Sequence, residues 1–210
     1  GLEVNVVSYS AAISACEKSK QSKKALELLA EMRERGLEPN VITYSAAISA
    51  CQKGKDPNST LELFIEMRRR SMEPNVVTYN AVICLFENDE ASEQALEILT
   101  DAGEGLEDRP DHVWHGAEDL REKQASLPEG GLGVEANEKG REAEMVLQLL
   151  AKMREQGLEP DALTYNAAIS ACSKCQQPGI ALELFERARA RGLKLDVIAY
   201  SAAISACSKG

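Results

Sequence analysis

A period of 35 residues governs this sequence. The run from Val6 to Asn40 is followed by a closely similar run from Val41 to Asn75, and another opens 35 residues later at Val76. The same spacing of 35 separates Ala162 from Val197. A fixed period between about 20 and 50 residues is typical of solenoids, in which each unit buries its apolar face by packing against its neighbours. The period therefore favours an elongated array over one or two globular domains.

Each unit encodes two short helices joined by a turn. Apolar residues recur at i, i+3, i+4 and i+7, which places them on one stripe of a helix. These stripes are Tyr44, Ala47, Ile48 and Cys51; Tyr9, Ala12, Ile13 and Cys16; and, in a second helix, Ala25, Leu28, Leu29 and Met32. We expect an all-α fold, a right-handed α-solenoid, with paired antiparallel helices over residues 6–99 and 141–207.

Glycine and proline mark the ends of the units. Gly36 and Gly157 suit a left-handed helix cap, because glycine adopts positive φ without a steric penalty. Pro39, Pro74 and Pro160 follow shortly and prevent the helix from continuing. With the period, these residues divide the chain into 1–5 (end of a preceding repeat), repeats at 6–40, 41–75 and 76–111, a degenerate repeat at 112–161, a repeat at 162–196, and the first helix of a truncated repeat at 197–210.

The middle of the chain departs from the pattern. Gly103 and Gly105 predict a shortened second helix in the repeat 76–111, since glycine costs about 1 kcal/mol relative to alanine inside a helix. The degenerate repeat 112–161 contains an acidic, glycine-rich insertion near 125–140, which we expect to be an exposed loop whose deletion leaves the flanking repeats folded. A regular helix should resume from Arg141 to Gln156.

Charge is distributed unevenly along the chain. The net charge is −10, yet residues 86–144 contain 18 acidic and 5 basic side chains, and the remainder is mildly basic at +3. Nucleic acid rewards positive charge, so any RNA-binding specificity would have to come largely from base-edge contacts and stacking. No apolar run approaches 18 residues, and we expect no membrane partner.

Cysteine and histidine offer two weak candidates for metal sites. Cys16, Cys51, Cys172 and Cys207 fall on the apolar stripes and are interpreted as small buried residues. Cys172 and Cys175 have the spacing of a metal or redox pair, but no second pair supports it. His112 and His115 with Asp111 could share a metal, although a decayed helix is the simpler interpretation. We expect neither a metal nor a cofactor.

The units open and close on recognisable motifs. Their openings are VVSYSAAISAC, VITYSAAISAC, VVTYNAVIC, ALTYNAAISAC and VIAYSAAISAC, and they close on Gly-Leu-Glu-Pro-Asn or a variant of it. A 35-residue helical hairpin with these features resembles the pentatricopeptide repeat family. The resemblance is poor only between about residues 103 and 141. The tetratricopeptide repeat has a period of 34, and its Trp-Leu-Gly pattern is absent here.

This resemblance implies a set of RNA-binding residues. In the family, single-stranded RNA lies along the first helices, and each repeat reads one base through two or three side chains. The fifth residue of a unit, aided by the last, contacts the base edge, and the second residue sandwiches the base. The base-reading residues would be Ser10, Asn40, Ser45, Asn75, Asn80, Asp111, Asn166, Asp196 and Ser201; the sandwiching residues would be Val7, Ile42, Val77, Leu163 and Ile198.

The resemblance also implies a base for each pair of reading residues. Ser with Asn implies adenine and Asn with Asp implies uracil, so the segment would favour A-A-U-x-U, read 5′ to 3′. The degenerate repeat has Gly116 at its fifth place and no side chain to read the x position. An interpretation without RNA is that Ser, Asn and Asp at these places are ordinary helix caps and turn residues.

Two functions follow as hypotheses. The first is sequence-specific binding of single-stranded RNA in organellar RNA processing, editing, stability or translation, in a mitochondrion or chloroplast, with processing or editing proteins as further partners and no DNA. The second is a helical-repeat scaffold for protein–protein interaction. The sequence contains no nucleophile–base pair, phosphate loop or paired catalytic carboxylates, so we expect no enzymatic activity.

Overall fold

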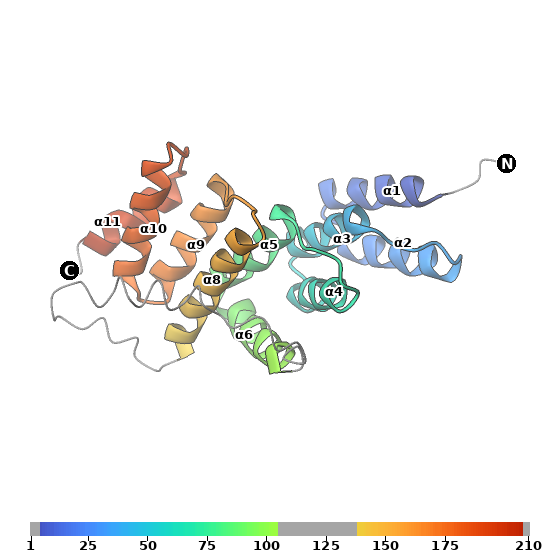
Figure 1. The fold of residues 1–210 in the computed structure, drawn as a ribbon, viewed down its shortest axis with the longest axis horizontal. Helices are drawn as coiled ribbons and strands as arrows, with labels where there is room; N and C mark the ends of the chain where they lie inside the picture. Colours follow the sequence, from blue (N-terminus) through green and yellow to red (C-terminus); the bar gives the residue numbers. More distant parts are fainter. Residues whose placement is uncertain (1–4, 105–137, 208–210) are drawn as a thin grey trace. The chain divides into compact units, whose positions relative to one another are not determined.

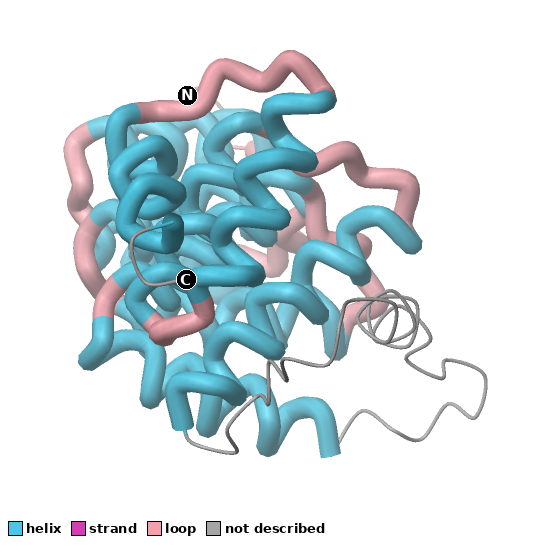
Figure 2. Tube along the Cα trace, turned by 90° about the vertical axis from the view of Figure 1, so that its left-hand side faces the viewer, coloured by secondary structure: helices cyan, strands magenta, loops and turns pink. Residues whose placement is uncertain are grey.

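The structure is a computed structural model that describes residues 5–104 and 138–207 (Figure 1). The chain forms two compact units, residues 1–85 and residues 86–210. Helices joined by short loops make up the described residues, and no strand occurs among them (Figure 2). The predicted all-α fold is confirmed.

The first unit is built from two complete hairpins and the first helix of another. α1 packs against α2 and α3 against α4, and the first helices α1, α3 and α5 lie side by side in that order (Figure 1). The helices are α1 (Val6–Lys18), α2 (Ser22–Glu34), α3 (Val41–Lys53), α4 (Pro57–Arg69) and α5 (Val76–Ile83). First helices therefore begin every 35 residues, as the sequence period requires.

The second unit has the same local architecture. α9 packs against α8, α10 and α11, and α6 packs against α8. The helices are α6 (Asp89–Glu104), α8 (Glu138–Glu155), α9 (Ala162–Lys174), α10 (Pro178–Ala190) and α11 (Val197–Cys207). The stacking of neighbouring hairpins within each unit defines an α-solenoid.

The apolar stripes form the core of both units. Tyr44, Ala47, Ile48 and Cys51 on α3 are completely buried. Full burial of one large apolar side chain contributes roughly 1.5–3 kcal/mol, so the repeated stripe supplies most of the stabilisation of each hairpin. In the first hairpin Ala12 and Leu28 are half-buried, while the other predicted stripe residues are buried.

The predicted left-handed caps are present. Gly36 has φ 71° and Gly157 has φ 70°, each just after a second helix. Their amides donate to the carbonyl oxygens of Arg33 and Arg154 at 2.9 Å, which satisfies acceptors left open at the helix ends. Ser71 occupies the equivalent place after α4 with φ 57°, at a conformational cost that glycine avoids.

Two helix boundaries differ from the sequence prediction. α6 continues to Glu104 and contains Gly103, because a glycine in a last, fraying turn costs less than one in a helix interior. α8 begins at Glu138, so the predicted loop 125–140 cannot extend past 137. Glutamate is favourable in the first turn of a helix, where Glu138 stands. Buried Glu142, in the following turn, accepts a 2.9 Å bond from Ser92 Oγ. The remainder of that predicted loop lies outside the described residues.

The helix that opens the repeat 76–111 is also shorter than its counterparts. α5 ends at Ile83 and continues as the 3₁₀ helix η1 (Cys84–Glu87). Leu85 and Phe86 are buried at the places where α3 has Ala50 and Cys51. We attribute the tighter turn to the space that these larger side chains require. None of the described helices has the length and the apolar composition of a membrane span.

Candidate nucleic-acid interface

An Asn or Asp residue caps each first helix. Asn40 Oδ1 accepts a hydrogen bond from Thr43 N at 3.0 Å, and Asn75 Oδ1 accepts one from Thr78 N at 3.1 Å. Asp196 Oδ1 accepts one from Ala199 N at 2.9 Å. The interpretation of these residues as helix caps is thus correct. Each of these caps uses one oxygen of the side chain, and the amide nitrogen or the second carboxylate oxygen takes no part in the cap.

In the second repeat the fifth and last residues contact each other directly. Asn75 Nδ2 donates to Ser45 Oγ at 2.9 Å, and Ser45 Oγ donates to the Val41 carbonyl at 2.7 Å. The Ser45 proton is therefore used within its own helix. One hydrogen of the Asn75 amide and one lone pair of Ser45 remain for an outside group.

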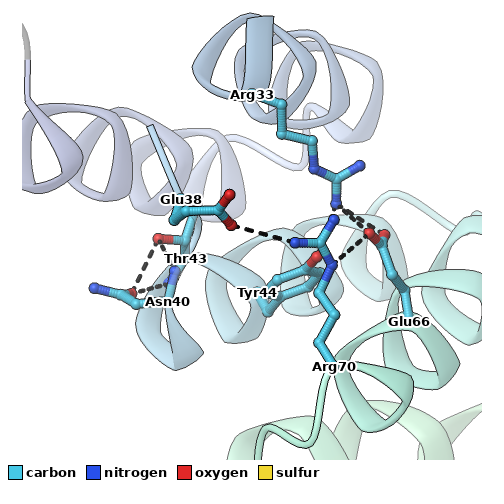
Figure 3. Close-up of polar contacts among 7 residues, drawn as sticks. All are labelled: Arg33, Glu38, Asn40, Thr43, Tyr44, Glu66 and Arg70. Carbon is cyan, nitrogen blue, oxygen red and sulfur yellow. Dashed lines mark hydrogen bonds and ion pairs between the residues drawn. The ribbon is translucent and has the colours of Figure 1, made fainter. Parts of the chain in front are cut away.

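In the first repeat the two residues are joined through a third. Ser10 Oγ lies 2.8 Å from Thr43 Oγ1, and Thr43 Oγ1 donates to Asn40 Oδ1 at 3.0 Å. Thr43 is completely buried between α1 and the start of α3. Figure 3 shows Asn40 and Thr43 turned toward each other across the first turn of α3.

In the pair formed by Asn166 and Asp196, the donor and the acceptor are exchanged between the fifth and the last place of the repeat. The backbone amide of Asp196 donates to Asn166 Oδ1 at 3.3 Å, and no bond within the described part of the chain uses the two amide hydrogens of Asn166. Asp196 Oδ1 is engaged in the cap, and Oδ2 can accept. This pair therefore offers a donor at the fifth place and a carboxylate acceptor at the last place, whereas the Ser–Asn pairs offer a hydroxyl lone pair at the fifth place and an amide donor at the last.

The remaining proposed reading residues are Asn80, Asp111 and Ser201. Asn80 is buried on α5, and its proposed partner Asp111 lies outside the described residues, as does Gly116. Ser201 is exposed on α11. Ser10 and Ser45 are more buried than a freely exposed helix face implies, because the following first helix packs beside them. The last residue of each pair is the more accessible member.

The proposed sandwiching residues form exposed apolar rows. Within the first unit Val7, Ile42 and Val77 stand at the second place of adjacent first helices, with exposed fractions of 74%, 66% and 47%. Leu163 and Ile198 occupy the same place in the second unit and are also exposed. Each exposed apolar side chain lies three residues before the fifth residue of its unit. Apolar contact surface and polar groups are thus adjacent in each well-formed repeat.

A polar cluster holds neighbouring repeats of the first unit together (Figure 3). Arg33 Nη2 donates to Tyr44 OH at 2.9 Å and to Glu66 Oε2 at 2.8 Å. Arg70 bonds Glu66 at 3.1 Å and Glu38 at 3.3 Å. Burial acts to raise the pKa of Glu66, but the bonds from Arg33 and Tyr44 outweigh it and lower that pKa. In the second unit Arg154 Nη2 donates to Tyr165 OH at 2.8 Å.

Tyr44 belongs to the core of its repeat and directly precedes the reading residue Ser45. Its ring is buried in the core, and its neighbours in sequence are Thr43 and Ser45. Sequence reasoning identified Tyr44 as a core residue and did not identify Arg33 or Thr43. An Arg stands 11 residues before Tyr44 and also before Tyr165, and this recurrence in the sequence could have identified Arg33.

The cysteines of the apolar stripes are part of the core where their side chains are described. Cys16, Cys51 and Cys172 are buried, as predicted, and the side chain of Cys207 is not described. Burial raises the pKa of the Cys51 and Cys172 thiols to about 12. Among the described residues no group of His, Cys, Asp and Glu is arranged to hold a metal. His112 and His115 lie outside those residues.

Comparisons with known proteins agree with this architecture. A model described as the PPR repeat family matches residues 4–53 and 160–209, and the pentatricopeptide repeat domain model matches residues 48–89, 62–101 and 134–175. Among curated proteins, none matches this sequence closely. A chain of stacked helical hairpins with these repeat signatures is a helical-repeat protein. It belongs to the pentatricopeptide repeat family.

Two solved structures illustrate the likeness. The pentatricopeptide repeat domain of Arabidopsis thaliana protein-only RNase P 1, solved with tRNA, is 13% identical with a TM-score of 0.58; the match covers 95% of this chain and 78% of that one. The maize pentatricopeptide repeat protein PPR10 is 25% identical with a TM-score of 0.43, and the match covers 98% of this chain and 27% of that one. The similarity to the Arabidopsis domain, with its TM-score of 0.58 at 13% identity, shows a shared fold.

Proposed function

We propose that this chain binds single-stranded RNA in a sequence-specific manner, with one base read by each well-formed repeat. The observation that carries the proposal is the contact between the fifth and last residues of a repeat. Asn75 Nδ2 bonds Ser45 Oγ at 2.9 Å, and Asp196 N bonds Asn166 Oδ1 at 3.3 Å, although about 30 residues separate the partners in each case. Each pair forms a compact polar unit of defined polarity.

The surroundings of these pairs suit a nucleobase. An exposed aliphatic side chain stands one turn away in each repeat, at Val7, Ile42, Val77, Leu163 or Ile198. A flat base packed between two such side chains would present its edge to the polar pair between them. Family membership and the tRNA-bound state of the Arabidopsis domain support RNA as the ligand. Proteins recognise RNA sequence mainly on such unstacked single strands.

The polarity of each pair agrees with the base that the family resemblance implies. The Ser–Asn pairs offer an N–H donor and a lone pair, which matches the ring nitrogen and amino group of adenine. The Asn166–Asp196 pair offers an N–H donor and a carboxylate, which matches O4 and N3–H of uracil. The proposed target of the five repeats is A-A-U-x-U, with its third base assigned from sequence alone.

The biological setting is part of the same proposal. The protein would act by binding rather than by catalysis, in RNA processing, editing, stability or translation within a mitochondrion or chloroplast. Processing or editing proteins would be recruited as partners. The support for this setting is membership of the pentatricopeptide repeat family.

The test is a double substitution of one pair, Asn166→Ser with Asp196→Asn. Binding would be measured by fluorescence anisotropy on oligoribonucleotides that differ only at the fifth base. We expect the preference to change from uracil toward adenine by roughly tenfold, since one good base-edge contact discriminates by about 1–3 kcal/mol. The preference at the first base, read by the unchanged Ser10 and Asn40, is the internal control. An unchanged preference at the fifth base would favour the protein scaffold instead.

A further inference from the structure

Thr43, at the third place of its repeat, links the reading residues of the repeat before it. Its hydroxyl lies 2.8 Å from Ser10 Oγ and 3.0 Å from Asn40 Oδ1. Ser10, Thr43 and Asn40 therefore form one hydrogen-bonded chain, with the completely buried threonine at its centre.

The number of protons fixes the direction of this chain. Asn40 Oδ1 has no hydrogen, so Thr43 must donate its single hydroxyl proton to it. Thr43 can then only accept from Ser10, which makes Ser10 the donor in the 2.8 Å contact. The Ser10 proton is directed inward, and only lone pairs of its oxygen can face a ligand.

Asn40 is held in one orientation by the same threonine. Its Oδ1 accepts from both the backbone amide and the hydroxyl of Thr43, at 3.0 Å each. No bond within the described residues uses the amide nitrogen of Asn40, and the residue is exposed. The pair therefore presents an N–H from Asn40 and a lone pair from Ser10.

We propose that Thr43 is a specificity-determining positioning residue: it fixes the donor–acceptor polarity of the Ser10–Asn40 pair, so that this repeat accepts bases with an amino group and rejects bases with a keto group. This inference rests on the proposed RNA-binding function. Without the Thr43 hydroxyl, Ser10 could turn its proton toward a keto oxygen, and the repeat would lose the distinction.

The next repeat supplies a matched control. Thr78 occupies the same place as Thr43 and is also completely buried. Its hydroxyl donates at 2.7 Å to the backbone carbonyl of Asn75, and Asn75 bonds Ser45 directly. Thr78 therefore bonds the backbone at the start of its own helix and takes no part in a chain between reading residues.

Adenosine and inosine are the probes that test this polarity. Inosine keeps the purine ring but replaces the 6-amino group by a keto oxygen and protonates N1, which reverses both contacts. The oligonucleotides carry adenosine or inosine at the first or the second base of A-A-U-x-U. The variants of the full chain are Thr43→Val and Thr78→Val, each nearly isosteric with the threonine it replaces.

The wild-type protein should bind adenosine over inosine at the first base by about tenfold, the effect of one base-edge contact. Thr43→Val should reduce this ratio to about threefold or less and leave the ratio at the second base unchanged. Thr78→Val should leave the ratio at the second base within about twofold of the wild-type value. A structural effect of losing a cap hydroxyl would instead lower affinity for all oligonucleotides alike, or affect both variants equally.

Three results would overturn the inference while leaving RNA binding intact. They are a wild-type protein that binds RNA but does not distinguish inosine from adenosine at the first base, a Thr43→Val variant with the wild-type ratio, and equal losses of discrimination in the two variants. Failure of the wild-type protein to bind any of the oligonucleotides would overturn the proposed function and this inference with it.

Discussion

A single side chain at the end of each repeat serves two purposes. Asn75 caps α5 through its oxygen and contacts Ser45 through its nitrogen. The cap oxygen contributes about 1 kcal/mol to stability. The nitrogen faces the neighbouring reading residue. Because the two atoms differ chemically, substitutions can separate stability from recognition.

Asn75→Asp should separate these two roles. An aspartate keeps an oxygen for Thr78 N and suits a helix N-terminus, so the free energy of unfolding should change by less than about 0.5 kcal/mol. The carboxylate cannot donate to adenine, so the adenine preference at the second base should be lost. Urea denaturation and anisotropy would measure the two effects. Asn75→Ala is the control and should lower both the free energy of unfolding and the adenine preference at the second base. An Asp variant as unstable as the Ala variant would contradict the prediction.

Part of this residue-scale chemistry could be predicted from the sequence. The family pattern identified Ser45 with Asn75 and Asn166 with Asp196, and the structure brings each pair into contact. Thr43 could not be identified, because its contact with Ser10 joins residues 33 apart and depends on a side-chain rotamer. Thr78 has the same sequence context and makes a different bond.

At the scale of elements, bonds between successive second helices hold the stack together. Arg33 on α2 reaches Tyr44 on α3 and Glu66 on α4. The periodicity predicted the helices and their apolar stripes, because both arise from local spacing. It did not predict the start of α8 at Glu138, nor the bond between Glu142 and Ser92, which joins residues 50 apart in the sequence. Nor did it predict the 3₁₀ turn of η1, where Leu85 and Phe86 need more space.

The Arg33–Glu66 contact should make stability depend on pH. The pKa of Glu66 is lowered from its ordinary value, so its contribution is present at neutral pH and is lost as pH falls through that lowered value. Both side chains are about one-third exposed, at 35% and 31%, so solvent screening limits the contribution to about 1 kcal/mol. Arg33→Met should therefore lower the free energy of unfolding by about that amount at pH 7.

Chemical denaturation of the wild-type protein and Arg33→Met from pH 7 to about pH 3 would measure this dependence. The difference between the two should shrink below about pH 4, where the unfolded carboxyl becomes protonated. Lys24→Met is a suitable control, because the side chains of Lys24 and Glu27 are both more exposed than those of Arg33 and Glu66. A difference that stays constant down to pH 3 would show that Arg33 acts through the packing of its stem or its bond to Tyr44, and not through Glu66.

At the scale of the whole molecule, charge sets how RNA binding should respond to salt. The chain has a net charge of −10, concentrated in residues 86–144. Several basic side chains are already engaged by acidic partners, including Lys53 with Glu17 at 2.7 Å and Arg35 with Glu31 at 2.6 Å. Outside residues 86–144 the net charge is only +3, so the chain lacks the strong excess of positive charge that favours binding to the phosphates of an RNA strand.

RNA binding should accordingly depend only weakly on salt. Each phosphate neutralised on a single strand contributes about −0.7 to the slope of log K against log salt, so we expect a slope no steeper than about −2. The measurement is anisotropy with A-A-U-x-U between about 50 and 200 mM salt. Glu17→Gln removes the acidic partner of Lys53 and could free one cation for a phosphate, so the slope should become more negative by at most about 0.7. A slope near −5 in the wild-type protein would mean that backbone charge dominates binding, and base discrimination by the Ser–Asn and Asn–Asp pairs would then be a minor part of the affinity.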